Sequence, residues 1–144
     1  MNLPQFYIDD IIKRALEEDI NYIDVTTDYL IDDSETSNAV FVAKDSGVLA
    51  GIDIAAKVFQ LIDSNIKVKI LIHDGGQVKN GDIIAKISGH TKALLKGERT
   101  ALNLLQHLSG IATATNKCVK LIEGTKATIT DTRKTLPGLR ALQK

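Results

Sequence analysis

The sequence predicts helices packed on a largely antiparallel sheet over residues 1–109, followed from residue 110 by the opening of an alternating α/β unit. Two observations carry this prediction. Up to about residue 90, short apolar runs with alternating or helical spacing are separated by Asp- and Gly-rich turns, which is typical of an α+β layer. From Thr91 the spacing becomes that of a long helix, and a Thr-rich extended run and a second helix follow it.

The first part of the chain begins with an amphipathic helix over residues 8–18, because its apolar side chains recur three and four positions apart. The polar stretches 24–28 and 32–36 are predicted as turns or loops. Residues 38–52 predict two short strands around a turn at Asp45-Ser46-Gly47, and the spacing over residues 54–62 then predicts a second helix.

Residues 66–73 alternate apolar and polar side chains, the pattern of a half-buried strand. Turns are expected at 74–76 and 79–81, where Gly follows Asp or Asn, and a further strand over 81–89. Together these elements predict the antiparallel sheet of the first domain.

A long apolar stripe at helical spacing runs from Thr91 and is predicted to be interrupted near Ser109-Gly110. A second helical stretch is expected from Ile111, then a strand over residues 126–134. Pro137 suits the first turn of a final helix. We therefore expect two domains, 1–109 and 110–144.

Composition and charge exclude several classes of protein. The 144 residues hold 18 basic and 18 acidic side chains, so the overall charge gives no basis for binding nucleic acid or an anionic membrane. No apolar run is long enough to span a bilayer, and the acidic N-terminus lacks the pattern of a signal peptide. Cys118 is the single cysteine, and we expect it to be buried on an apolar stripe of a cytoplasmic protein.

Arg133 and Lys134 are the most informative pair of residues. They follow a predicted strand and precede a turn into a helix, and ligands of α/β folds bind at the carboxyl ends of strands. Arginine can hold a carboxylate or phosphate with two parallel hydrogen bonds, and lysine supplies a compact charge. The alternative is a solvated charge pair in a loop.

The other candidate positions have simpler interpretations. Arg99 on the long helix is an exposed charge or pairs with a carboxylate one turn away, and Asn103 packs between helices. The three histidines lack metal-ligand spacing. The turn at Lys79 is similar to the hairpins of biotinyl- and lipoyl-carrier domains, but the residues that flank a modified lysine are missing.

Two longer motifs identify a family. The run GERTALNLLQHLSGIAT at 97–113 and the run DTRKTLPGLR at 131–140 closely resemble motifs of the quinolinate phosphoribosyltransferase family. DVTT at 24–27 and AKDSGVLAGI at 43–52 also fit, in the same order. Leu136 departs mildly, since the family often has a second threonine there.

The resemblance implies a fold, a reaction and a site. It implies an N-terminal α/β sandwich followed by an incomplete α/β barrel, and the conversion of quinolinate and phosphoribosyl pyrophosphate, with Mg²⁺, to nicotinate mononucleotide, pyrophosphate and CO₂ in NAD biosynthesis. Thr132, Arg133 and Lys134 would hold the dicarboxylate at the end of the first barrel strand. Arg99 would enter the same pocket from a neighbouring subunit, so at least a homodimer is expected. The resemblance assigns no side chain of this chain as acid, base, nucleophile or metal ligand.

A complete barrel needs about 200 residues or more. The Mg²⁺ and phosphoribosyl-binding residues of the family would lie beyond Lys144, so we expect residues 1–144 to be an incomplete portion without activity of its own. Two alternatives stay open: a superfamily paralogue with another substrate, such as the homologue associated with molybdenum transport, and a non-catalytic short homologue that binds a full-length partner.

Overall fold

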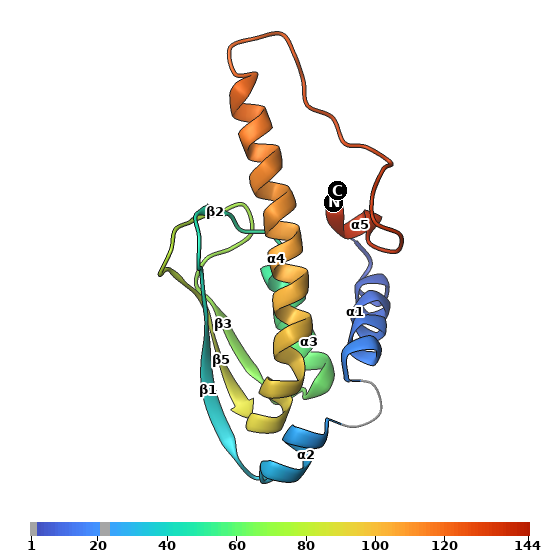
Figure 1. The fold of residues 1–144 in the computed structure, drawn as a ribbon, viewed down its shortest axis with the longest axis vertical. Helices are drawn as coiled ribbons and strands as arrows, with labels where there is room; N and C mark the ends of the chain where they lie inside the picture. Colours follow the sequence, from blue (N-terminus) through green and yellow to red (C-terminus); the bar gives the residue numbers. More distant parts are fainter. Residues whose placement is uncertain (1–2, 21–23) are drawn as a thin grey trace.

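The computed structural model describes residues 3–20 and 24–144, which form a small sheet covered by helices (Figure 1). The elements follow the chain in this order: α1 (Gln5–Ile20), α2 (Val25–Leu30), β1 (Thr36–Val42), β2 (Gly47–Val48), α3 (Ile52–Ile62), β3 (Lys67–Ile70), β4 (Gln77–Val78), β5 (Ile83–His90), α4 (Thr91–Leu121) and α5 (Arg140–Gln143).

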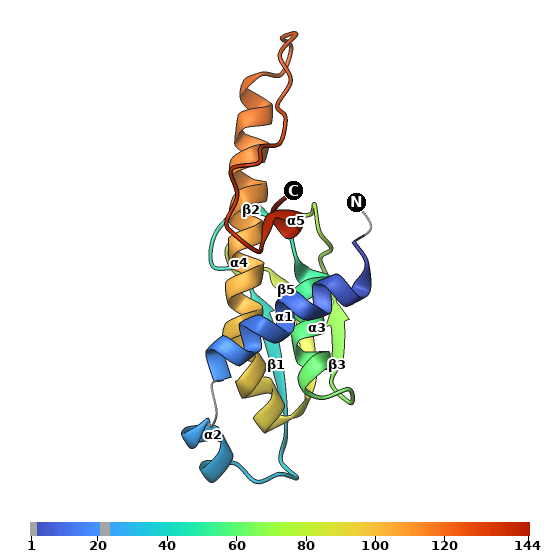
Figure 2. The same ribbon diagram turned by 90° about the vertical axis from the view of Figure 1, so that its right-hand side faces the viewer.

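The sheet has the strand order β1-β5-β3, and both of its strand pairs are antiparallel. The helices α3 and α4 lie on one face of this sheet, and α1 crosses both of them on their far side (Figures 1 and 2). The short strands β2 and β4 form a separate antiparallel pair. The predicted layer of helices on an antiparallel sheet is therefore confirmed.

The core lies between the sheet and the pair α3 and α4. Phe41 of β1 meets Phe59 of α3 with ring centroids 6.1 Å apart, and Ala101 of α4 is fully buried beside them. Gly97 brings the two helices close, since a Cβ atom at this position would lie 2.7 Å from Phe59 Cδ1. Both helices are amphipathic, so burying their apolar stripes against the sheet supplies the main driving force for this packing.

The start of α3 is fixed from a distant turn. Both carboxylate oxygens of Asp74 accept backbone hydrogen bonds at 2.9 Å, one from Gly51 and one from Ile52. These are N–H groups that a helix terminus leaves without partners, so the predicted turn at 74–76 serves as the cap of a helix. The predicted helices at 8–18 and 54–62 are confirmed as α1 and α3.

The prediction of a loop at 24–28 is wrong, because α2 begins at Val25. The carboxylate of Asp24 accepts a hydrogen bond from the backbone N–H of Thr27 at 3.2 Å, which makes Asp24 an N-cap. Lys96 of α4 lies 2.5 Å from Asp28 and holds the short helix in place. The polar residues of DVTTD thus begin a helix that tertiary contacts stabilise.

The predicted interruption near Ser109-Gly110 is also wrong, since α4 runs unbroken from Thr91 to Leu121. Ser109 and Thr113 instead make hydrogen bonds from α4 to another part of the chain. Ser109 Oγ accepts the backbone N–H of Ala50 at 3.0 Å, and Thr113 Oγ1 accepts that of Val48 at 2.9 Å. These two hydroxyls lie one helical turn apart on α4, and they hold β2 and the residues that follow it against this helix.

The extended run 126–134 is not a strand in this structure. A strand needs a neighbour to pair its backbone N–H and C=O groups, and no strand of the described residues pairs with this run. The final helix, α5, begins at Arg140 rather than in a first turn at Pro137, and Gly138 between them has a φ of 81°. The segment 122–139 is thus an extended connection back toward the middle of α4 (Figure 1).

Cys118 is exposed, which corrects the prediction that it is buried. The last turns of α4 project beyond the sheet (Figure 1), and Leu121 near their end is 83% exposed. An apolar stripe buries its residues only where another element covers it. Asn103 is likewise exposed, so it does not pack between helices.

Candidate functional site

The residues Thr132, Arg133 and Lys134 lie together in the connection between α4 and α5, and all three are exposed. Thr132 Oγ1 accepts the backbone N–H of Lys134 at 3.2 Å, which turns the chain within the motif. We call the segment from Thr132 to Leu136 the TRKT loop.

The cationic groups of the TRKT loop are unpaired. Within residues 3–20 and 24–144, neither the Arg133 guanidinium nor the Lys134 ammonium makes a hydrogen bond or ion pair through its side chain. Two unpaired cations at adjacent positions on a short turn can bind one anionic ligand with several charge-assisted hydrogen bonds.

Arg99 lies on a different element and has a partner. Its Nη1 donates to Asp19 Oδ1 at 2.8 Å, although the arginine side chain remains 73% exposed. The carboxylate comes from α1, so the alternative that Arg99 pairs one turn away on α4 is wrong, whereas the alternative of an exposed charge agrees with the structure. No hydrogen bond or ion pair of the described residues joins Arg99 to the TRKT loop of its own chain.

Residues of α5 support the TRKT loop, and sequence reasoning missed them. The Arg140 guanidinium donates to Thr135 Oγ1 at 3.1 Å and to the carbonyl of Arg133 at 3.2 Å. Gln143 Oε1 accepts the backbone N–H of Leu136 at 3.1 Å. The sequence signals neither contact, because each depends on how a loop of seven residues folds back on itself.

The ends of the connection are tied down as well. Lys144 Nζ lies 2.6 Å from Asp131 Oδ2, directly before the TRKT loop. Gln143 Nε2 lies 2.7 Å from Nε2 of His107, which places α5 against the middle of α4. The loop is therefore held to the body of the molecule by side chains that lie outside residues 132–136.

The ring of another histidine has a structural partner. His90 Nδ1 lies 2.6 Å from Asp63 Oδ2, where α4 begins beside the end of α3. The backbone N–H of Asn65, together with this ring, holds the pKa of the Asp63 carboxyl below its ordinary value.

Across residues 3–20 and 24–144, no three His, Cys, Asp or Glu side chains converge as a metal site.

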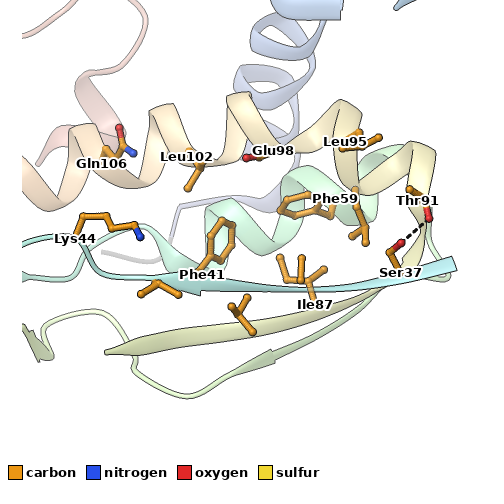
Figure 3. Close-up of a pocket in the computed structure, with 14 residues that line it drawn as sticks. Ser37, Phe41, Lys44, Phe59, Ile87, Thr91, Leu95, Glu98, Leu102 and Gln106 are labelled. Atoms are coloured by element: carbon orange, nitrogen blue, oxygen red, sulfur yellow. Dashed lines mark hydrogen bonds between the residues drawn. The ribbon is translucent and has the colours of Figure 1, made fainter. Parts of the chain in front are cut away.

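A groove of about 490 Å³ lies between β1 and α4 (Figure 3). Its walls are mostly apolar and include Phe41, Phe59 and Leu102, while the Ser37–Thr91 hydroxyl pair, 2.7 Å apart, closes one end. None of the predicted site residues lines it.

Among the helices that the structure describes, none combines the length and apolarity that crossing a bilayer requires.

Comparison with known proteins gives the family. Residues 24–109 match the family model for the quinolinate phosphoribosyl transferase N-terminal domain, and residues 111–144 match the C-terminal domain. The nicotinate-nucleotide pyrophosphorylase [carboxylating] of Mycobacterium leprae is 42% identical over 138 residues, which cover 94% of this chain and 49% of that protein. A probable enzyme of the same name from Bacillus subtilis is 42% identical over 134 residues, 93% of this chain and 46% of that protein.

Solved structures agree with these matches. NadC from Streptococcus pyogenes superposes with a TM-score of 0.94 at 38% identity, covering 99% of this chain and 50% of that one. The nicotinate-nucleotide pyrophosphorylase from Francisella tularensis gives a TM-score of 0.92 at 37% identity, with 99% and 50% coverage. This likeness confirms the predicted fold class.

The chain spans about half the length of the curated relatives it matches. The two matched family models together cover residues 24–144 except residue 110, in the order that the motifs at 97–113 and 131–140 predicted. The chain belongs to the quinolinate phosphoribosyltransferase family.

Proposed function

We propose that this chain contributes the dicarboxylate-binding loop of a quinolinate phosphoribosyltransferase, which makes nicotinate mononucleotide, pyrophosphate and CO₂ from quinolinate and phosphoribosyl pyrophosphate. The side chains of Arg133 and Lys134 on the exposed TRKT loop, which have no partner among the described residues, support this proposal most strongly. Membership of the family supplies the identity of the substrates.

The charges of the loop suit the substrate. Quinolinate carries two neighbouring carboxylates, so Arg133 can bind one of them with two parallel hydrogen bonds while Lys134 neutralises the other. The Thr132 hydroxyl adds a polar contact at the same turn. Holding both carboxylates fixes the ring, and this directs the ring nitrogen toward the ribosyl carbon that it attacks.

Arg99 completes the proposed site from a neighbouring subunit. Its side chain is 73% exposed and reaches no residue of its own TRKT loop, as expected of a group that acts on another copy of the chain. The proposal therefore includes at least a homodimer. A third cation near the carboxylates would favour loss of CO₂, because it stabilises the negative charge left on the ring.

Mg²⁺ belongs to the proposed reaction, where it would stabilise the charge of the departing pyrophosphate. The described residues do not converge on a metal site, so we assign no Mg²⁺ ligand among them. We propose further that residues 1–144 alone are inactive and that the protein acts in the cytoplasm.

Calorimetric titration of the complete gene product with quinolinate tests the proposed binding site. We expect Arg133→Ala to weaken binding by about tenfold or more, since it removes a charge-assisted pair of hydrogen bonds. Arg14→Ala is the matched control, because Arg14 is exposed on α1 and has no recorded partner among the described residues. Quinolinate should also bind more tightly than nicotinate, which has one carboxylate.

Two outcomes would contradict the proposal. Equal quinolinate affinity of wild type and Arg133→Ala would remove the TRKT loop from the site. Absence of quinolinate binding by the folded wild-type protein would favour the paralogue with another substrate, or a non-catalytic homologue, which co-purification with a full-length partner would reveal.

A further inference from the structure

The side chain of Gln143 joins the TRKT loop to the long helix. On one side, its Oε1 accepts the backbone N–H of Leu136 at 3.1 Å. On the other, its Nε2 lies 2.7 Å from His107 Nε2 on α4. One amide thus connects residue 107 to residue 136, and the unpaired cations of Arg133 and Lys134 lie just before the bound peptide group.

The direction of these two hydrogen bonds is determined by the backbone. An N–H of Leu136 can only donate, so it must meet the oxygen of the Gln143 amide. The NH₂ group of the same amide then faces the imidazole and donates to it. His107 must therefore present the lone pair of Nε2 as an acceptor, which only the neutral tautomer with its proton on Nδ1 does.

A protonated ring cannot take part in this arrangement. Its Nε2–H would face the NH₂ group of Gln143, and two donors repel each other. Rotating the amide by 180° would satisfy His107 but would place the NH₂ group against the N–H of Leu136. Either way one contact is lost, so protonation of His107 disconnects α4 from the TRKT loop.

Arg140 holds the same loop independently. It donates to Thr135 Oγ1 and to the carbonyl of Arg133, and neither bond involves His107. Loss of either Gln143 contact therefore breaks the link between α4 and the TRKT loop, and the loop stays attached to α5 through Arg140. This predicts a local change rather than unfolding.

The charged groups on the elements packed against α4 do not engage His107. Several have other partners: Lys57 with Asp9, Lys92 with Asp33, Lys96 with Asp28, Arg99 with Asp19, and Lys144 with Asp131. The other charged or titratable side chains are Tyr7, Asp10, Lys13, Arg14, Glu17 and Glu18 on α1, Tyr29 on α2, Lys44 and Asp45 before β2, Asp53 on α3, Lys86 and the Asp63-bound His90 on β5, Glu98, Lys117, Cys118 and Lys120 on α4, and the loop-bound Arg140 on α5. Within the described residues, none makes a hydrogen bond or ion pair with the His107 ring.

We infer that Gln143 is a positioning residue that anchors the TRKT loop to α4 only while His107 is neutral, so that His107 acts as a proton-controlled release of the loop. The anchor is present while the His107 ring is neutral and is lost when the ring binds a proton, so it weakens as pH falls. The consequence for substrate binding rests on the proposed function, whereas the anchor itself does not.

Hydrogen exchange of the peptide containing residues 132–139 tests the anchor in the complete gene product. Protection factors correct for the effect of pH on intrinsic exchange, so they report the opening of the loop. We expect wild type to lose protection in this peptide by roughly three- to tenfold between pH 8 and 5.5, the effect of losing one neutral hydrogen bond. In Gln143→Leu, the protection factor of this peptide should be low at both pH 8 and pH 5.5.

Two variants separate the proton switch from other effects of pH. Gln143→Glu has two acceptor oxygens, which accept from Leu136 and from either the neutral or the protonated ring of His107. His107→Gln carries an acceptor that does not titrate in this range. Both variants should keep the protection of the peptide from pH 8 to 5.5, and protection of α3 and the sheet should be the same in all four proteins.

The inference is overturned if Gln143→Leu keeps wild-type protection at pH 8, or if Gln143→Glu and His107→Gln lose protection with pH as wild type does. Quinolinate binding separates this result from the proposed function. If the exchange pattern is as expected, wild-type affinity should fall more steeply than that of Gln143→Glu between pH 8 and 6. If quinolinate affinity falls equally with pH in wild type and Gln143→Glu, the anchor inferred from hydrogen exchange still stands, but a role for the TRKT loop in binding is contradicted.

Discussion

At the scale of single residues, the pair formed by Arg99 and Asp19 shows how a surface arginine is oriented. The carboxylate of Asp19 is 20% exposed and belongs to α1, so a carboxylate that is largely buried on α1 orients an arginine side chain that is mostly exposed. A guanidinium has five N–H donors, and one contact with Asp19 leaves most of them available for an anionic ligand.

We therefore predict that Asp19→Asn weakens quinolinate binding by the complete gene product by about two- to fivefold. The effect is small because an exposed ion pair contributes little and solvent screens it. Calorimetric titration measures it, with Asp10→Asn as the control, since Asp10 is an exposed carboxylate of the same helix with no recorded partner in the described chain. Tighter binding by Asp19→Asn would show that Asp19 competes with the substrate for Arg99.

At the scale of elements, α4 has two glycines in very different surroundings. Gly97 is buried against α3, where a Cβ atom would lie 2.7 Å from Phe59 Cδ1 and 3.1 Å from Ile62 Cδ1. Gly110 has no atom within 4 Å of the same position. The two sites therefore separate the helix propensity of alanine from the cost of overpacking.

We predict effects of opposite sign for alanine at these positions. Gly110→Ala should stabilise the protein by up to about 1 kcal/mol, because alanine loses less backbone entropy in a helix than glycine does. Gly97→Ala should destabilise it by about 1–2 kcal/mol, since the forced separation of α3 and α4 outweighs that gain. Urea denaturation of both variants measures the change in the free energy of unfolding. Stabilisation by Gly97→Ala would mean that the two helices are not closely packed there.

The elements also show which structural features the sequence could predict. Helices and strands with strong apolar periodicity, such as α1, α3 and β5, agree with the prediction because their pattern and their burial have the same cause. The predictions at Ser109 and Asp24 were wrong. A serine occurs both inside helices and at their ends, and an aspartate occurs both in loops and as an N-cap, so only their hydrogen-bond partners distinguish these cases. The exposure of Cys118 depends on how far α4 extends past the sheet.

Some residues of the candidate site could be predicted from the sequence, and others could not. Arg133 and Lys134 were predicted from their motif, and the structure shows their side chains exposed and unpaired within residues 3–20 and 24–144. The contacts of Arg140 and Gln143 with this loop, and of Gln143 with His107, were missed, since no local pattern reveals the conformation of the loop. Asp19 lies 80 positions from Arg99, and only the folded chain brings them together.

At the scale of the whole molecule, α4 connects the two parts of the chain as one continuous helix. Its first turns pack in the core with α3, and its middle receives α5, which supports the TRKT loop. The stable N-terminal layer thus provides the framework against which the loop is positioned. In the proposed dimer, the same layer presents Arg99 to the other subunit.

The most direct test of this account is quinolinate-dependent release of CO₂ by the complete gene product in the presence of phosphoribosyl pyrophosphate and Mg²⁺, with a purified 1–144 polypeptide assayed beside it. We expect equal amounts of CO₂ and nicotinate mononucleotide from the complete protein, and none from residues 1–144. Absence of CO₂ from the folded complete protein would contradict the proposed reaction, and turnover by the 1–144 polypeptide would contradict the proposal that this part is inactive alone.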